Sequence, residues 1–151
     1  MFVAIGRILF AVLFVFSGAS KLLDIAATAQ GITEKVAIPA VLATYTGQLE
    51  TMTGMPIAQL LAIAAGAIEV ICGLMIALNF GARFFAIVLV LFVATVTVYY
   101  HNFWDMTGPD RLNNMIHALK NLSLIGALLI IAGYPRPYRS DAEVAYTDSH
   151  H

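Results

Sequence analysis

Three ionisable side chains lie inside otherwise apolar stretches of this sequence. Lys21 lies near the end of the first stretch, Glu69 in the middle of the second and Lys120 inside the last. A charged group in an apolar environment is costly unless it is paired. An amine and a carboxylate held together there can form a structural tie, bind a polar ligand or exchange a proton. These three residues are therefore the first candidates for a functional site.

Depth along each helix predicts which of these groups meet. At the rise of an α-helix, Glu69 lies roughly 18 Å and Lys120 roughly 12 Å below one surface. A lysine stem spans that difference, so we expect a Glu69–Lys120 pair, direct or through a water molecule. Lys21 lies roughly 3–5 Å deep, where it snorkels outward, pairs with Asp24 or reaches toward Glu69. Arg7 approaches from the opposite surface and is the competing partner for Glu69.

The last apolar stretch also carries a polar face, because Asn113, His117 and Asn121 recur every four residues. The third stretch ends in His101 and faces them. We expect these side chains to join the ionisable groups in a buried polar network or pocket, although the pattern assigns none of them a catalytic role. The predicted set is Ser17, Lys21, Glu69, His101, Asn113, His117, Lys120 and Asn121.

Two interpretations of this set stay open, and both can hold at once. In the first, the Glu69–Lys120 pair fixes helix register, as buried pairs do without adding net stability. In the second, an outward-open polar pocket binds a small amphipathic ligand such as a quinone, or relays protons. Its predicted aromatic walls are Tyr99, Tyr100 and Trp104, which also suit anchors at a membrane–water interface.

The sequence predicts neither a metal site nor a covalently bound cofactor. His101, His117 and a glutamate have suitable ligand chemistry but lack the local spacing of a ligand motif. The chain contains no haem signature, flavin fingerprint or Cys-x-x-Cys motif. Its one cysteine, Cys72, cannot form an internal disulfide. The net charge of −1 gives no indication of nucleic-acid binding.

Long membrane helices are the elements expected to position these groups. Of 151 residues, 60% are hydrophobic and 11% are charged, and the mean hydropathy is +0.85. A soluble domain of this size exposes too much surface to be so apolar, so lipid is the predicted solvent. A bilayer core requires about 20 helical residues, and barrel strands would alternate. The predicted spans are about 2–23, 57–78, 82–100 and 112–131.

The predicted fold is therefore an all-α membrane protein with a four-helix transmembrane bundle. Between the first two spans, apolar residues recur at helical spacing from Ile38 to Met52, and Pro39 suits a helix start. This pattern predicts a short amphipathic helix at the lipid interface. Residues 1–135 form one bundle, and residues 136–151 form a polar tail.

Small residues indicate where the spans pack closely. Ala62, Gly66 and Gly73 share the face of Glu69, and Gly18 lies beside Ser17 and Lys21 on the first span. Small side chains let membrane helices approach closely. The short turn Asn79-Phe80-Gly81 makes the second and third spans antiparallel neighbours.

Four spans place both termini on one side of the membrane. The cations of that side are Arg7, Arg83, Arg136 and Arg139. The opposite side holds Lys21, Lys35 and Arg111. The positive-inside rule therefore places both termini in the cytoplasm.

Three segments resemble the DoxX family of four-helix bacterial membrane proteins. They are GRILFAVLFVFSGASKL in the first span, GAIEVICGLMIAL in the second and HALKNLSLIGALLI in the fourth. The family-like polar positions are Arg7, Ser17, Lys21, Glu69, His101, Lys120 and Asn121. The resemblance implies a multi-pass protein of the bacterial inner membrane.

The resemblance also implies a link to redox chemistry. The family takes its name from a subunit associated with an archaeal quinol oxidase and thiosulfate:quinone oxidoreductase. We therefore expect an accessory subunit of a respiratory or redox membrane complex, with its polar pocket near the quinone pool. Its partners would be the bilayer and other membrane subunits, or further copies of itself. The alternatives are an independent quinone- or thiosulfate-linked oxidoreductase component, and an oligomeric small-solute carrier or channel.

Overall fold

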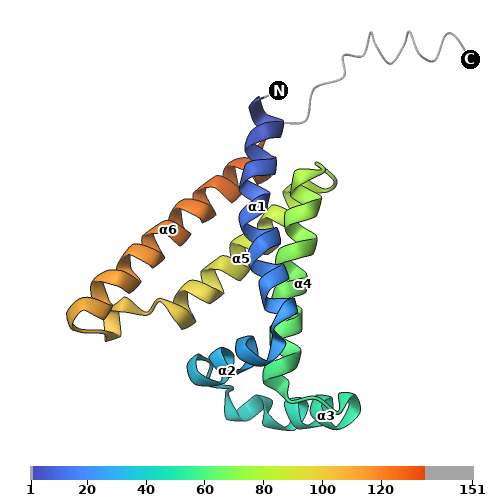
Figure 1. The fold of residues 1–151 in the computed structure, drawn as a ribbon, viewed down its shortest axis with the longest axis vertical. Helices are drawn as coiled ribbons and strands as arrows, with labels where there is room; N and C mark the ends of the chain where they lie inside the picture. Colours follow the sequence, from blue (N-terminus) through green and yellow to red (C-terminus); the bar gives the residue numbers. More distant parts are fainter. Residues whose placement is uncertain (1, 135–151) are drawn as a thin grey trace, which may run out of the picture.

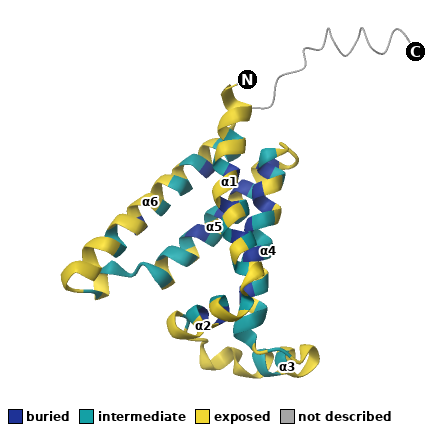
Figure 2. Cartoon of the chain, viewed as in Figure 1, coloured by how far each residue is buried: buried dark blue, intermediate teal, exposed yellow. Residues whose placement is uncertain are grey.

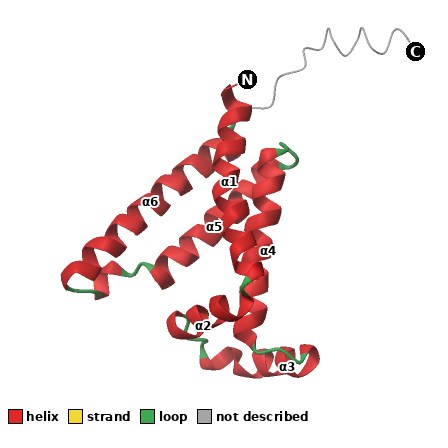
Figure 3. Ribbon diagram, in the orientation of Figure 1, coloured by secondary structure: helices red, strands yellow, loops and turns green. Residues whose placement is uncertain are grey.

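The computed structural model describes residues 2–134, and its regular elements in that range are all helices (Figures 1 and 3). The elements in chain order are α1 (Phe2–Leu23), α2 (Ile25–Lys35), η1 (Ala40–Leu42), α3 (Ala43–Thr53), α4 (Ile57–Ala77), α5 (Ala82–Tyr100), η2 (Phe103–Asp105) and α6 (Gly108–Gly133). The polar tail predicted for residues 136–151 lies outside the described residues.

The four helices α1, α4, α5 and α6 are long and apolar enough to cross a membrane, which confirms the predicted fold class. The bounds of α1, α4 and α5 follow the predicted spans closely, whereas α6 begins four residues before 112. The reason is its polar first turn, in which Pro109 fits the helix start because that position needs no intrahelical N–H bond. An apolar run marks the membrane-crossing part of a helix and not its whole length.

The connection between α1 and α4 contains two α-helices where the sequence predicted one. The predicted amphipathic helix corresponds to η1 and α3, and Pro39 precedes η1. The missed helix, α2, is capped by Asp24, whose Oδ1 accepts a hydrogen bond from the Ala27 N–H at 3.0 Å. Its sequence IAATAQGITEK is rich in small and polar residues, although Ile25, Ala29 and Ile32 recur at helical spacing. Burial of Ala29 and Ile32 against Ala62 of α4 fixes its place.

Helix α3 presents apolar side chains to its surroundings. Tyr45, Leu49 and Met52 are all exposed, and α3 contacts only η1 and the start of α4 to any extent. These three side chains share one face of the helix, but α3 carries only one charged residue, Glu50, so its amphipathic character is weak. Its location at the interface stays a prediction.

Helices α1 and α4 form the tightest contact of the described chain, and glycines make it possible. A Cβ atom on Gly18 would lie 2.6 Å from the Gly66 carbonyl oxygen and 2.8 Å from Glu69 Cβ. A Cβ atom on Gly66 would lie 2.9 Å from the Gly18 carbonyl oxygen. All three distances are shorter than ordinary van der Waals contact, so the two backbones touch where a side chain would separate them. Of the predicted small-residue face of α4, Gly66 and Gly73 pack on α1, whereas Ala62 packs on α2.

Helix α5 lies between α4 and α6 and packs against both. The fully buried side chains Ile76, Leu89 and Leu128 come from these three helices in turn. About a third of the apolar window of α4 (33%) is buried, against 11% for α6, so α4 is central and α6 is peripheral (Figure 2). Figure 1 shows α5 and α6 as a hairpin that diverges from α1 and α4. No extended contact joins α6 to α4 within residues 2–134.

We expect Gly18→Ala to destabilise the bundle by about 1–3 kcal/mol, because the added methyl group meets backbone atoms of α4. Thermal unfolding in detergent measures the loss as a lower midpoint. Gly6→Ala, on the same helix, is the matched control, because a Cβ atom there meets nothing within 4 Å. Equal midpoints for the two variants would contradict the close contact.

Candidate functional site

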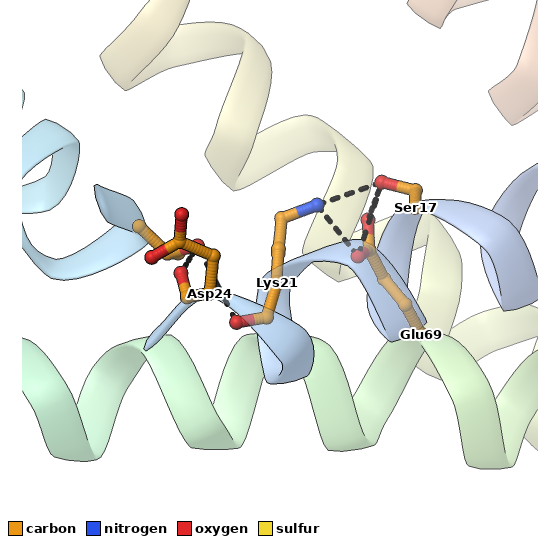
Figure 4. A network of polar contacts seen from close by, with 5 residues as sticks. Ser17, Lys21, Asp24 and Glu69 are labelled. Atoms are coloured by element: carbon orange, nitrogen blue, oxygen red, sulfur yellow. Dashed lines mark hydrogen bonds and ion pairs between the residues drawn. The ribbon is translucent and has the colours of Figure 1, made fainter. Parts of the chain in front are cut away.

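Glu69 is the buried charged residue of the described chain, and it faces α1. Its side chain is 8% exposed and pairs with Lys21, whose Nζ lies 2.7 Å from Glu69 Oε2 (Figure 4). Ser17 lies one turn before Lys21 on the same face of α1. Its Oγ lies 3.2 Å from Glu69 Oε1 and accepts a hydrogen bond from Lys21 Nζ at 2.7 Å. We call Ser17, Lys21 and Glu69 the core triad.

The geometry of the core triad follows from the glycine contact. Gly18 and Gly66 bring the backbones together, and residues 17 and 21 then lie on the same side of α1, facing Glu69. Leu22 contacts Gly66, so the last turn of α1 is level with the middle of α4. The first two turns of α4 extend beyond α1 and pack against α2. Glu69 therefore meets Lys21 near the end of α1.

The core triad combines three kinds of proton-handling group. The amine donates, the carboxylate accepts, and the hydroxyl does either. The Lys21 side chain is 30% exposed, so the lysine borders the surroundings of the bundle while Glu69 stays covered. A charged pair at the membrane level of a bundle is a functional-site hypothesis by default, because an unpaired charge there is costly.

The predicted Glu69–Lys120 pair is wrong. Lys120 is exposed on α6, while the Glu69 carboxylate is occupied by Lys21 and Ser17. The prediction placed α4 and α6 at a common surface and assumed that they were neighbours, but α5 separates them. Neither interpretation of the polar set can therefore rest on Lys120.

The two competing partners have other roles. Asp24 caps α2 instead of pairing with Lys21 (Figure 4). Arg7 does not reach Glu69, and its Nη1 donates a hydrogen bond to Asn79 Oδ1 in the turn between α4 and α5. Lys21 is therefore the cationic partner of Glu69 among residues 2–134.

Three of the five remaining predicted polar residues gather between α5 and α6, away from the core triad, whereas Asn113 and Lys120 are exposed on α6 and join neither cluster. The rings of His101 and His117 stack with centroids 5.0 Å apart, and His101 Nδ1 lies 3.1 Å from Asn114 Oδ1. Deeper in the hairpin, Asn121 Nδ2 donates to Thr97 Oγ1 at 2.9 Å. The structure therefore divides the predicted network into two clusters, the core triad and this α5–α6 cluster.

Sequence reasoning missed Asn114 and Thr97. Asn114 lies three residues before His117, so helical spacing could have found it, but the strict four-residue repeat selected Asn113, which is exposed. Thr97 looked like an ordinary β-branched residue in an apolar span.

A cavity of about 440 Å³ adjoins Asn114 and is lined also by Lys35, Met106, Thr107 and Asp110.

The predicted aromatic anchors lie at the end of α5 and in η2. Tyr99 is 39% and Trp104 53% exposed, whereas Tyr100 is partly buried and packs against the cluster of α2 and α4. The exposed pair suits an interface position, whereas Tyr100 is a packing residue.

Comparison with known proteins supports the family resemblance over the first two thirds of the chain. The sequence model of the DoxX family matches residues 2–102, about two thirds of the chain. This chain belongs to the DoxX family. It is also 37% identical, over 87 residues, to the inner membrane protein YphA of Escherichia coli (strain K12). That alignment covers 58% of this chain and 62% of YphA. No solved structure matches the chain significantly.

Together with the four apolar helices, these matches identify a multi-pass inner membrane protein of the DoxX family. The family match contains the core triad and His101 but ends before α6. His117, Lys120 and Asn121, together with the fourth-span segment quoted above, therefore lie outside the matched region. Within this DoxX protein, the core triad is the polar cluster that both the structure and the family match contain.

We expect the Lys21–Glu69 pair to behave as one energetic unit. Lys21→Met leaves a buried carboxylate without its cation, and Glu69→Gln leaves the amine without its anion, so each single change destabilises the protein. Lys21→Met in a Glu69→Gln background should cost less, with a coupling energy of about 1–3 kcal/mol. Unfolding midpoints of the four proteins in detergent give this value.

Lys120→Met is the matched control for that cycle, because it removes a lysine from an exposed position of another span. Its effect should stay within about 0.5 kcal/mol. Strictly additive effects at positions 21 and 69, or a large loss for the Lys120 variant, would contradict the assignment of the pair.

Proposed function

We propose that this DoxX protein is an accessory subunit of a respiratory or other redox membrane complex. In this role the core triad binds the polar head of a quinone and exchanges protons with it. The observation that carries the proposal is the Lys21–Glu69 pair, 2.7 Å apart, in which the Lys21 side chain is 30% exposed and the Glu69 side chain is covered.

The chemistry of the core triad supports this role. Reducing a quinone to a quinol takes two electrons and two protons, and the proton steps need donors placed close to the carbonyl oxygens. The Lys21 amine is a hydrogen-bond donor for a carbonyl, and Glu69 is a proton acceptor and donor for general acid–base chemistry. Ser17 connects the two groups. In the proposed complex the electrons come from a partner subunit that carries a redox centre.

The surface of the bundle supports association with other membrane components. Most of each membrane-spanning window is not buried inside the chain, and α6 is the extreme case (Figure 2). Lipid, partner subunits or further copies of this protein are the partners that cover such surfaces in a membrane. Helix α6 lies outside the family match, and in this proposal it makes the contacts with partners that distinguish this protein from its relatives.

We also propose that both termini face the cytoplasm. Arg7 and Arg83 lie at the bundle end where α1 begins. Lys21 near the end of α1, Lys35 at the end of α2 and Arg111 in the first turn of α6 lie toward the other end. Arg136 and Arg139, which the sequence assigned to the terminal side, lie outside the described residues.

The purified protein should bind a short-chain benzoquinone such as decylubiquinone in detergent. Lys21→Met and Glu69→Gln should each weaken binding by about tenfold, the equivalent of one charge-assisted hydrogen bond. Isothermal titration measures the affinity. Lys120→Met is the control and should bind normally. Unchanged binding in folded Lys21 and Glu69 variants would refute the quinone site.

The accessory role has a separate test. Mild detergent extraction of native membranes should yield the protein together with a subunit that carries a redox centre, identified by mass spectrometry and its visible spectrum. Purification as an isolated chain that reduces a quinone without a partner would instead favour the independent oxidoreductase component.

A further inference from the structure

A groove with a volume of about 640 Å³ lies at the terminal end of the bundle, away from the core triad. It is formed where α1 begins, α5 begins and α6 ends (Figure 1). Its walls are largely apolar and include Val3, Phe10, Phe84, Ile130 and Ile131. This volume is in the range of small-ligand sites.

Two arginines, Arg7 and Arg83, line this apolar groove. Each is oriented by a neutral acceptor: Arg7 donates to Asn79 Oδ1, and Arg83 Nε donates to the Tyr134 carbonyl at 3.1 Å. A neutral acceptor leaves the guanidinium charge in place. Arg7 Nε is buried without a hydrogen-bond partner among residues 2–134, so the Asn79 contact does not satisfy the whole group.

Carboxylates of the described chain do not balance these charges. Glu69 is paired with Lys21. The other acidic residues between positions 2 and 134 lie toward the opposite end, in the connections or in the first turn of α6, at Asp24, Glu34, Glu50, Asp105 and Asp110. The groove is therefore a positive site with apolar walls.

The start of α5 adds to the positive potential. Gly81 precedes the helix, no side chain caps it, and both Gly81 and Ala82 line the groove. N–H groups in a first helical turn lack intrahelical partners and favour an anion. The carbonyl end of α6 contributes a negative potential to the groove, but Arg83 already donates a hydrogen bond to the Tyr134 carbonyl oxygen there.

The position of the groove matches the headgroup level of a bilayer. Arg83 is the second residue of α5, and Arg7 lies roughly 8 Å along α1 from its start. Phe84 and Ile130, 67% and 72% exposed, continue the apolar wall toward the lipid-facing surface. An occupant of this groove needs an anionic head and a hydrocarbon tail in one molecule.

We propose that the groove binds an anionic phospholipid of the membrane, with Arg7 and Arg83 contacting its phosphate and the apolar wall contacting an acyl chain. Guanidinium groups bind phosphate oxygens through charge-assisted and often bidentate hydrogen bonds. This site is independent of the core triad and of quinone binding.

Native mass spectrometry of the full, delipidated protein tests the site with phosphatidylglycerol and phosphatidylcholine of identical acyl chains. The wild-type protein should prefer phosphatidylglycerol. Arg83→Gln, and the double variant Arg7→Gln/Arg83→Gln, should lose at least about tenfold in phosphatidylglycerol affinity and leave phosphatidylcholine binding unchanged. Arg111→Gln, at the opposite end, is the matched control and should bind as wild type does.

Further measurements distinguish a bound phospholipid from a free phosphate ion and from the chain's own acidic tail. Arg83→Lys keeps the positive charge and should recover part of the preference for phosphatidylglycerol that Arg83→Gln loses. Because Arg7 is unchanged in both variants, this comparison holds even if Arg7→Gln disturbs the turn that Arg7 contacts. Equal binding of both lipids, or a preference that survives in the double variant, would overturn the proposal. So would displacement of the lipid by millimolar inorganic phosphate. A large gain in lipid affinity on neutralising Asp141, Glu143 and Asp148 together would assign the groove to the tail instead.

Discussion

The close contact of α1 and α4 at Gly18 and Gly66 is the constraint on which the rest of the structure depends. It sets a helix separation short enough for residues 17 and 21 of one helix to hydrogen-bond a carboxylate of the other. A methyl group at either glycine would push the backbones apart, and the buried carboxylate would lose its partners. The ion pair is thus a consequence of backbone packing, and it in turn fixes the register of the two helices.

The membrane-crossing elements could be predicted from the sequence because their signal is local. Long apolar runs, a tight turn after Leu78 and small residues on the face of Glu69 need no knowledge of distant contacts. The partner of Glu69 could not be found in the same way. Lys21 and Lys120 are both lysines near the same predicted surface, and only the order of neighbours in space separates them. The extension of α4 beyond α1 also changes the depth at which Glu69 lies.

Helix α2 and the α5–α6 cluster show the same limit at a smaller scale. The sequence of α2 is rich in small and polar residues, and its position depends on burial against Ala62. The rings of His101 and His117 stack, but the contact of His101 with Asn114 and the separate Asn121–Thr97 bond depend on how two helices diverge. A polar residue's partner is a property of the tertiary structure, whereas its presence on a helix face is a property of the sequence.

The separation of Lys21 from Glu69 along the chain has a consequence for biogenesis. The two partners are 48 residues apart, so at ordinary translation rates the lysine is synthesised roughly 2–10 s before the glutamate. During that interval α1 carries an uncompensated ammonium. Because Lys21 lies close to the end of the helix, its long side chain can reach headgroups and water before Glu69 is available. Glu69 has a shorter side chain and lies in the middle of α4, so it cannot reach headgroups or water in this way. Because α1 is synthesised first, Lys21 is already present when Glu69 enters the bilayer.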